Sequence, residues 1–174
     1  MILRVLFFIL IGTAVVADIN EADSIKIIDW LTENSKYEYN GEELPDVVFE
    51  TIPDMCKVLY PNGVPDPCEI AGYYNNDTNT IYIADTPTTH MVEEGYKEAV
   101  LVHELVHFLQ WINGEYDKVA CRQELEKDAF KLQDQYIDEY GLPEENQNDP
   151  LFALLVSNCP ELLWPTPGLT PGGG

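Results

Sequence analysis

The apolar residues of this chain recur with a helical period in some segments and with the shorter period of strands in others. Helices are predicted at Ser24–Asn34, Val92–Asn113, Asp117–Tyr140 and Asp149–Leu155. Strands are predicted at Asp46–Glu50, Ala71–Tyr74 and Thr80–Ile83. The last two strands flank a polar turn at residues 75–77, which is typical of a β-hairpin. Helices and a few short strands in one chain indicate a small α+β fold.

The two ends of the chain differ from its middle. Arg4 precedes an apolar run, residues 5–11, and small residues that end at Ala17, which is the pattern of a secretory signal peptide. We predict that residues 1–17 are removed and that the protein is secreted or periplasmic, with an uncleaved membrane anchor as the alternative. Residues 166–174 are rich in proline and glycine and are predicted to form a flexible tail. Residues 18–165 then form a single domain, since no repeat or linker interrupts them.

Composition and charge narrow the classes of function. The chain has 174 residues, 45% of them hydrophobic, which is enough for a globular domain with its own core. Its formal net charge of -22 excludes a nucleic-acid-binding protein, because phosphates would be repelled. The same repulsion acts against anionic lipids, so we expect no stable membrane partner. The charge is compatible with a merely solvated acidic surface or with attraction of cationic substrates.

If the protein is exported, we expect its four cysteines to form disulfides, because disulfides persist in oxidising compartments. Cys56, Cys68, Cys121 and Cys159 allow three pairings. We favour Cys56–Cys68, which would close a proline-rich loop. Cys121 would then pair with Cys159 and join the second long helix to the C-terminal helix. A zinc-bound thiolate at Cys121 is the alternative.

Two of the three histidines lie four residues apart in the segment His103-Glu104-Leu105-Val106-His107. This H-E-x-x-H motif lies within a predicted helix, where residues four apart leave the same face. Two imidazoles so placed suit a single tetrahedral zinc ion, and the adjacent Glu104 carboxylate can accept a proton from a zinc-bound water. A chance grouping on a core helix is the alternative interpretation.

A zinc site of this kind needs a third protein ligand. The second long helix carries Glu124 and Asp128, which share a face because they are four residues apart. We predict that Glu124 coordinates the metal and that Asp128 accepts a hydrogen bond from a ligating histidine. Glu126 is the reserve ligand. An exposed charged helix face is the alternative for all three acidic residues.

The motif followed by Glu124-x-x-x-Asp128-x-Phe130 resembles the gluzincin metallopeptidases. The short spacing and the small size are similar to minigluzincins and to the ImmA/IrrE-like small zincins, although Val106 stands where ImmA-like proteins often have glycine. The resemblance covers residues 70–140 and implies a minimal zincin-like domain, in which a small sheet or hairpin packs on the motif helix and a second helix bears the third ligand. The strand at Thr80–Ile83 would be the edge strand that lines an extended substrate.

The resemblance implies a zinc-dependent peptidase acting on a peptide or protein substrate. Glu104 would be the general base that takes a proton from a zinc-activated water and returns it to the leaving amine. Candidates for stabilising the oxyanion are Tyr136, Tyr140 and His90. The competing hypothesis is a non-catalytic binding or inhibitory protein that keeps the zinc scaffold. A third possibility is a latent enzyme whose cleft is blocked by the tail at Trp164–Pro165.

Overall fold

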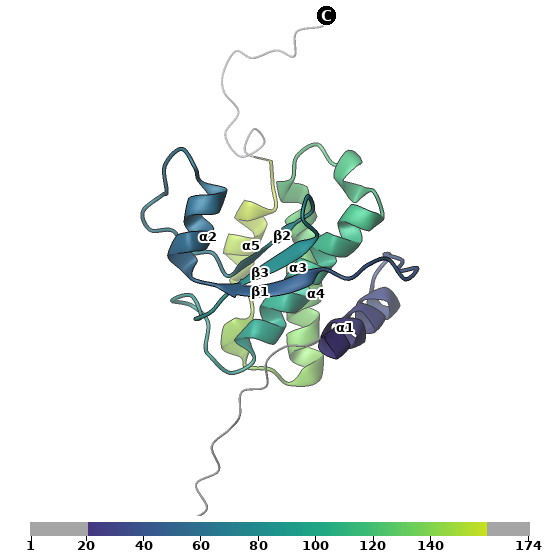
Figure 1. The fold of residues 1–174 in the computed structure, drawn as a ribbon. Coiled ribbons are helices and arrows are strands. Elements are labelled where there is room, and N and C mark those ends of the chain that lie inside the picture. The colour runs from purple at the N-terminus through teal and green to yellow at the C-terminus, as the bar shows by residue number, and fades with distance from the viewer. Residues whose placement is uncertain (1–20, 160–174) are drawn as a thin grey trace, which may run out of the picture.

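The computed structural model describes residues 21–159, which adopt the predicted α+β fold (Figure 1). The elements in chain order are α1 (Glu21–Asn34), β1 (Asp46–Glu50), α2 (Ile52–Leu59), β2 (Gly72–Asn75), β3 (Thr80–Ala84), α3 (Tyr96–Ile112), α4 (Gln123–Tyr140) and α5 (Pro150–Val156). Within these residues, no helix combines the length and the apolar character that crossing a membrane requires. The predicted signal peptide, residues 1–17, and the predicted tail, residues 166–174, lie outside the described residues.

The sheet has three strands in the order β1-β3-β2. β2 and β3 form the predicted antiparallel hairpin, with Tyr73 opposite Tyr82, and β1 runs parallel to β3, with Val48 opposite Tyr82. β3 is therefore the central strand, and most of its side chains are buried. The prediction that Thr80–Ile83 is an edge strand is wrong, because β1 and β2 pair with β3 on its two sides. The edge strands of the sheet are β1 and β2.

Helix α3 lies at the centre of the fold. It packs on β2 and β3 on one side and contacts α1 and α4 elsewhere on its surface (Figure 1). Because it has neighbours on several sides, almost every residue from Ala99 to Gln110 is buried, as expected for a helix that is apolar around most of its circumference. The polar side chains of this helix must consequently find partners inside the protein.

Helix α3 begins at Tyr96, four residues later than the apolar pattern indicates. The preceding Gly95 has a positive φ of 71°, which is not helical. The buried side chain of Asn146 also holds the loop before the helix, because it accepts a hydrogen bond from the backbone of Val92 and donates one to the backbone of Glu94. The later start is thus imposed by a residue 54 positions along the chain from Val92.

Helix α2 was not predicted, although its first turn carries a recognisable signal. Thr51 caps the helix by accepting a hydrogen bond from the backbone N–H of Asp54, and Pro53 lies in the first turn, where a missing N–H costs nothing. Helix α4 also begins later than expected, because Glu115–Asp117 forms a separate 3-10 turn before it. Its C-terminal end at Gly141, which has a φ of 67°, confirms the predicted stop.

The favoured cysteine pairing is confirmed. Cys56 is bonded to Cys68, and Cys121 is bonded to Cys159. The first disulfide ties α2 to the loop before β2, and the second ties the residues before α4 to those after α5. Cys121 is therefore not a free thiolate that can bind zinc. The two disulfides are compatible with an extracellular protein, since such bonds persist in oxidising compartments.

Candidate metal centre

The two histidines of the H-E-x-x-H motif point to one place. They are four residues apart on α3, and their Nε2 atoms lie 3.2 Å from one another. The Nδ1 atom of His103 lies 3.0 Å from Gln133 Oε1, and the Nδ1 atom of His107 lies 2.8 Å from Gln110 Oε1. Because a glutamine Oε1 only accepts hydrogen bonds, both Nδ1 atoms carry a proton. In a neutral imidazole of this tautomer, the Nε2 lone pair is then left for a metal ligand bond.

Glu126 supplies the third donor atom of this cluster, a carboxylate oxygen. Its Oε2 atom lies 3.1 Å from His103 Nε2 and 3.4 Å from His107 Nε2. One ligand atom from each of the three residues lies within 4.8 Å of the others. The reserve prediction for the third ligand therefore matches the geometry.

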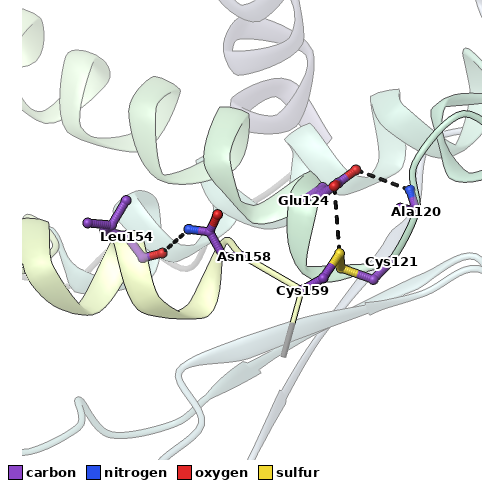
Figure 2. Close-up of a disulfide and its surroundings, with 6 residues drawn as sticks. All are labelled: Ala120, Cys121, Glu124, Leu154, Asn158 and Cys159. Carbon is purple, nitrogen blue, oxygen red and sulfur yellow. Dashed lines mark hydrogen bonds between the residues drawn. A yellow bond between two sulfur atoms is a disulfide. The ribbon is translucent and has the colours of Figure 1, made fainter. Parts of the chain in front are cut away.

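The prediction that Glu124 joins the two histidines is corrected by its position. Its carboxylate lies beside the second disulfide, where it accepts a hydrogen bond from the backbone N–H of Ala120, 3.1 Å away, and lies 3.6 Å from Cys159 Sγ (Figure 2). The grouping of Cys121, Glu124 and Cys159 offers no metal site, because both sulfur atoms are consumed by the disulfide.

The geometry of α4 explains why Glu126 takes this place. The buried stripe of the helix follows Leu125, Ala129, Leu132 and Tyr136. Residues 124 and 126 lie about 100° to either side of Leu125, since each residue turns the helix by that amount. The flank with Glu126 also carries Phe130, whose ring centroid lies 4.8 Å from that of His103, and Gln133. This i, i+4, i+7 row faces the histidines, whereas the row with Glu124 faces away from them.

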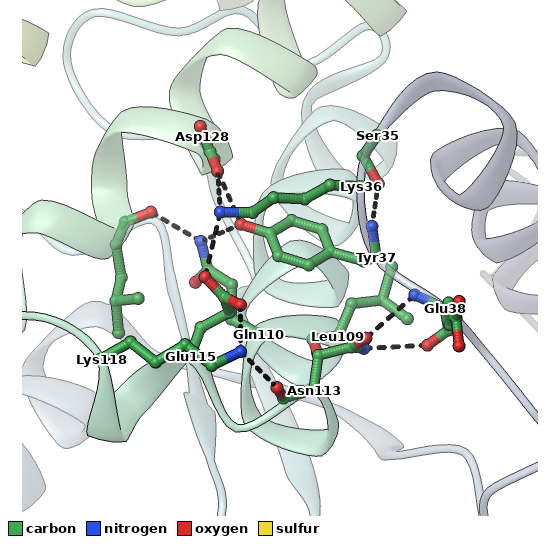
Figure 3. A network of polar contacts seen from close by, with 11 residues as sticks. Ser35, Lys36, Tyr37, Glu38, Leu109, Gln110, Asn113, Glu115, Lys118 and Asp128 are labelled. Carbon is green, nitrogen blue, oxygen red and sulfur yellow. Dashed lines mark hydrogen bonds and ion pairs between the residues drawn. The ribbon is translucent and has the colours of Figure 1, made fainter.

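Asp128 does not contact either histidine, in contrast to the prediction. Its Oδ2 atom accepts a hydrogen bond from the Tyr37 hydroxyl at 2.7 Å. The Gln110 side chain connects this pair to the site. Its Nε2 donates a hydrogen bond to Tyr37 Oη at 3.2 Å (Figure 3), and its Oε1 lies 2.8 Å from His107 Nδ1. A second donation, to the backbone carbonyl of Leu125 at 2.8 Å, fixes the amide of Gln110 against α4. Asp128 thus acts on the site through two intermediate side chains.

Glu104 is buried beside the cluster. Burial raises the pKa of its carboxyl above the ordinary value, while His103, His107 and a hydrogen bond from the Tyr74 backbone act in the opposite direction. Gly72 makes room for this carboxylate under β2. A Cβ atom at Gly72 would lie 3.1 Å from Glu104 Oε1, and only 2.6 Å from Val100 Cγ1. Strand β2 therefore lies directly against helix α3 at the position of Glu104, the proposed general base.

The charges within the cluster depend on one another. Burial alone would lower the pKa of His107, but the hydrogen bond and the negative charge of Glu126 outweigh burial and raise the pKa to about 9. Burial likewise acts to raise the pKa of Glu126, and the hydrogen bonds from both histidines hold it well below its usual range. In the metal-free protein a proton on His107 therefore neutralises the Glu126 carboxylate.

The three donors fit a zinc ion. In a tetrahedral site whose ligand atoms lie about 2.0–2.1 Å from the metal, neighbouring ligand atoms are about 3.3 Å apart. The three separations among His103 Nε2, His107 Nε2 and Glu126 Oε2 are 3.1, 3.2 and 3.4 Å. Two imidazoles and one carboxylate are also the donor set of catalytic zinc sites, which keep a fourth position open.

A cavity of about 220 Å³ opens beside the donors. Its walls come from β2, from α3 and from the segment around the start of α4, and the lining residues are Gly72, Tyr73, Tyr74, His103, Glu104, His107, Tyr116, Arg122, Leu125 and Glu126. Tyr116 and Arg122 were not identified from the sequence. Both precede α4, in a region where no regular pattern signals that side chains converge on the motif.

The three candidates for stabilising an oxyanion lie elsewhere. The Tyr136 hydroxyl donates a hydrogen bond to Glu98 at 2.7 Å, and Tyr140 stacks on Tyr136. His90 is largely exposed and lies 4.0 Å from Glu69. None of the three lines the cavity. Tyr116 does, and burial raises its pKa to about 12 in spite of the nearby Arg122, so its hydroxyl remains a hydrogen-bond donor at neutral pH.

Residues 19–162 match the protein family described as Domain of unknown function (DUF6647). Because the match covers most of the chain, the protein belongs to this family. No curated protein and no solved structure matches the chain.

Proposed function

We propose that this chain, as a member of the DUF6647 family, is an exported zinc-dependent peptidase. The observation that carries the proposal is the convergence of His103, His107 and Glu126 on one point in a cavity whose wall also contains the Glu104 carboxylate. A site that only stabilises the fold needs no general base beside the metal and is usually closed by a fourth protein ligand. Here the Glu104 carboxylate lies beside the cluster, and three protein donors form it.

In this proposal each side chain has a defined task. His103, His107 and Glu126 would hold a zinc ion, which when bound would supply Lewis-acid activation of a water and of the scissile carbonyl. Glu104 takes a proton at its carboxylate and delivers it to the leaving amine. Its burial and raised pKa suit this exchange, because a base works best when its pKa approaches the working pH. The hydroxyl of Tyr116 is the donor available to a developing oxyanion.

The edge strand supplies the binding site for an extended peptide. β2 pairs with β3 along one edge and lines the cavity through Gly72, Tyr73 and Tyr74. A strand at the edge of a sheet can pair with an added peptide strand through backbone hydrogen bonds, which is a common mode of peptide recognition. A substrate bound in this way would pass over Glu104 and the metal ligands.

The test combines metal content with cleavage. We expect purified protein to contain stoichiometric zinc and to cleave members of a mixed peptide library. Glu104→Gln should keep the zinc and lose the cleavage by at least about 100-fold, the usual size of a lost general base. Glu98→Gln is the matched control, since it changes another carboxylate of α3 that lies outside the cavity and can still accept the Tyr136 hydrogen bond.

Two outcomes would contradict the proposal. Bound zinc without cleavage that depends on Glu104 would leave the binding or inhibitory protein as the better interpretation. Absence of stoichiometric metal from the wild type and from Glu104→Gln would exclude the zinc site.

A further inference from the structure

Among the lysines and arginines of residues 21–159, Arg122 is the one that lines the cavity. Arg122 contributes to the wall that also contains Glu104 and the three zinc-binding candidates. Among residues 21–159, no carboxylate forms an ion pair with its guanidinium group.

The guanidinium group is held in place by an aromatic ring. Its central carbon lies 4.1 Å from the ring centroid of Tyr116, a stacking geometry that favours arginine over lysine. Tyr116 is itself packed edge-on against Trp111, with ring centroids 5.4 Å apart. The disulfide at Cys121 anchors the neighbouring backbone. Arg122 is thus preorganised, with its hydrogen-bond donors unused by other residues of the described chain.

The charge balance of the site points in the same direction. A zinc ion together with ionised Glu104 and Glu126 would be formally neutral, so Arg122 would leave one positive charge in the cavity. A planar guanidinium group binds a carboxylate through two parallel hydrogen bonds. We infer that Arg122 binds a carboxylate group of the substrate, so that the enzyme prefers peptides with a C-terminal carboxylate or an acidic side chain close to the scissile bond.

This inference rests on the proposed peptidase function and contrasts with the cationic substrates that the net charge would favour. The difference is one of range. The acidic surface acts over the Debye length, about 10 Å at 0.1 M salt, whereas Arg122, an exposed residue of the cavity wall, would act by direct contact. The charge of the site therefore decides the substrate class, although the surface charge influences how fast a substrate arrives.

The experiment compares four peptides derived from one sequence that the enzyme cleaves. The first pair differs in having a free or an amidated C-terminus, and the second pair, both amidated, has glutamate or glutamine beside the scissile bond. For the wild type we expect kcat/KM to be at least about tenfold higher for the carboxylate member of one pair, as is typical of a hydrogen bond between charged groups. The pair that shows the preference identifies which carboxylate is bound.

Variants then assign the preference to Arg122. Arg122→Ala should retain its zinc and lose the preference for the carboxylate peptide. Arg122→Lys should keep part of this preference, because lysine keeps the positive charge but cannot form the two parallel hydrogen bonds to a carboxylate. Lys127→Ala is the matched control, since it removes a charge from an exposed position of α4 that does not line the cavity. Equal preference in the wild type and in Arg122→Ala would overturn the inference.

A binding measurement separates this inference from the peptidase proposal. Acetyl-trialanine with a free carboxylate and its amide are titrated into the metal-free wild type, Arg122→Ala and Lys127→Ala, so that direct coordination of the carboxylate to zinc plays no part. Tighter binding of the carboxylate form that requires Arg122 supports the inference even if no cleavage is observed, in which case only the peptidase proposal fails. Equal binding of both forms to the wild type, together with equal kcat/KM for the glutamate and glutamine peptides, would refute the inference.

Discussion

The Oε2 atom of Glu126 lies 3.1 Å from the Nε2 atom of His103, although 23 residues separate them in the chain. This contact joins the two long helices of the fold. It also selects one of two glutamates that flank the same buried leucine of α4. The proposed metal centre therefore depends on the rotation of α4 about its own axis, and α4 is held in that rotation by its buried stripe and by the disulfide at its N-terminal end.

Zinc affinity distinguishes the two glutamates. Glu126→Gln should weaken zinc binding by more than about 100-fold, because the loss of a ligand exceeds the 10- to 100-fold effect of an outer hydrogen-bond partner. Glu124→Gln should leave the affinity within about threefold of the wild type, since its carboxylate lies at the disulfide. Competition with a chromogenic chelator measures both. A larger loss for Glu124→Gln than for Glu126→Gln would restore the original prediction.

The glutamines behind the histidines should be needed for tight binding. Gln133→Leu removes the acceptor that orients His103, and we expect zinc affinity to fall by about 10- to 100-fold. Gln133→Glu keeps an acceptor oxygen and should retain more of the affinity. Gln135→Leu is the control on the same helix, since Gln135 bonds Asn34 and lies outside the cavity. Equal affinities for Gln133→Leu and the wild type would show that the contact does not orient the ligand.

Zinc binding should release a proton from His107. Its pKa of about 9 in the metal-free protein means that it is protonated near neutral pH, whereas a zinc ligand must be neutral. Glu126 releases none, because its pKa is lowered and it is already ionised. Calorimetry in two buffers with different ionisation enthalpies should therefore report about one proton released, and the apparent affinity should rise about tenfold per pH unit up to pH 9. An affinity that does not vary with pH over this range would contradict the assignment.

The raised pKa of His107 also makes the free energy of unfolding depend on pH. The folded-state pKa of His107 exceeds its ordinary value of 6.5, so its contribution to the free energy of unfolding is fully present below pH 6.5 and is lost as the pH rises through about 9. Denaturant unfolding of the metal-free protein should show this loss. Zinc-loaded protein should not show it, because the metal then replaces the proton.

The contact between β2 and α3 leaves no space for a side chain at residue 72. Gly72→Ala would place Cβ 2.6 Å from Val100 Cγ1 and 2.9 Å from the Tyr82 carbonyl oxygen, and we expect a loss of about 1–3 kcal/mol in the free energy of unfolding. Combining Gly72→Ala with Val100→Ala removes the clash with the Val100 side chain but not the clash with the Tyr82 carbonyl oxygen. The double variant should therefore show a favourable coupling without full recovery, as measured by a double-mutant cycle in urea. Additive losses would mean that the strand moves away freely.

Tyr116→Phe tests the donor in the cavity. The variant keeps the aromatic ring under Arg122 but removes the hydroxyl, so we expect kcat to fall by about 100-fold with little change in KM. Tyr136→Phe is the control, because its hydroxyl is bonded to Glu98 and does not line the cavity. A change in KM alone would indicate that Tyr116 only binds substrate.

Local patterns in the chain were sufficient for much of the fold. The strand at Asp46–Glu50, the hairpin, the motif helix and the stop at Gly141 follow from periodicity and turn chemistry, which act between residues close in sequence. The pairing of His103 with His107 belongs to the same class, since one helical turn brings them together. The favoured disulfides also agree with the structure, although spacing alone allowed three pairings.

The contacts that complete the site depend on long-range packing. Glu124 and Glu126 are equivalent by helical geometry until α4 docks on α3, and only then does one of them face the imidazoles. Gln133 meets His103 only through the same docking, and Tyr116 and Arg122 reach the cavity from a segment whose sequence carries no periodic signal for it. Periodicity assigns a side chain to a face of its own helix or strand, whereas the element that covers that face is chosen by the free energy of packing the whole core.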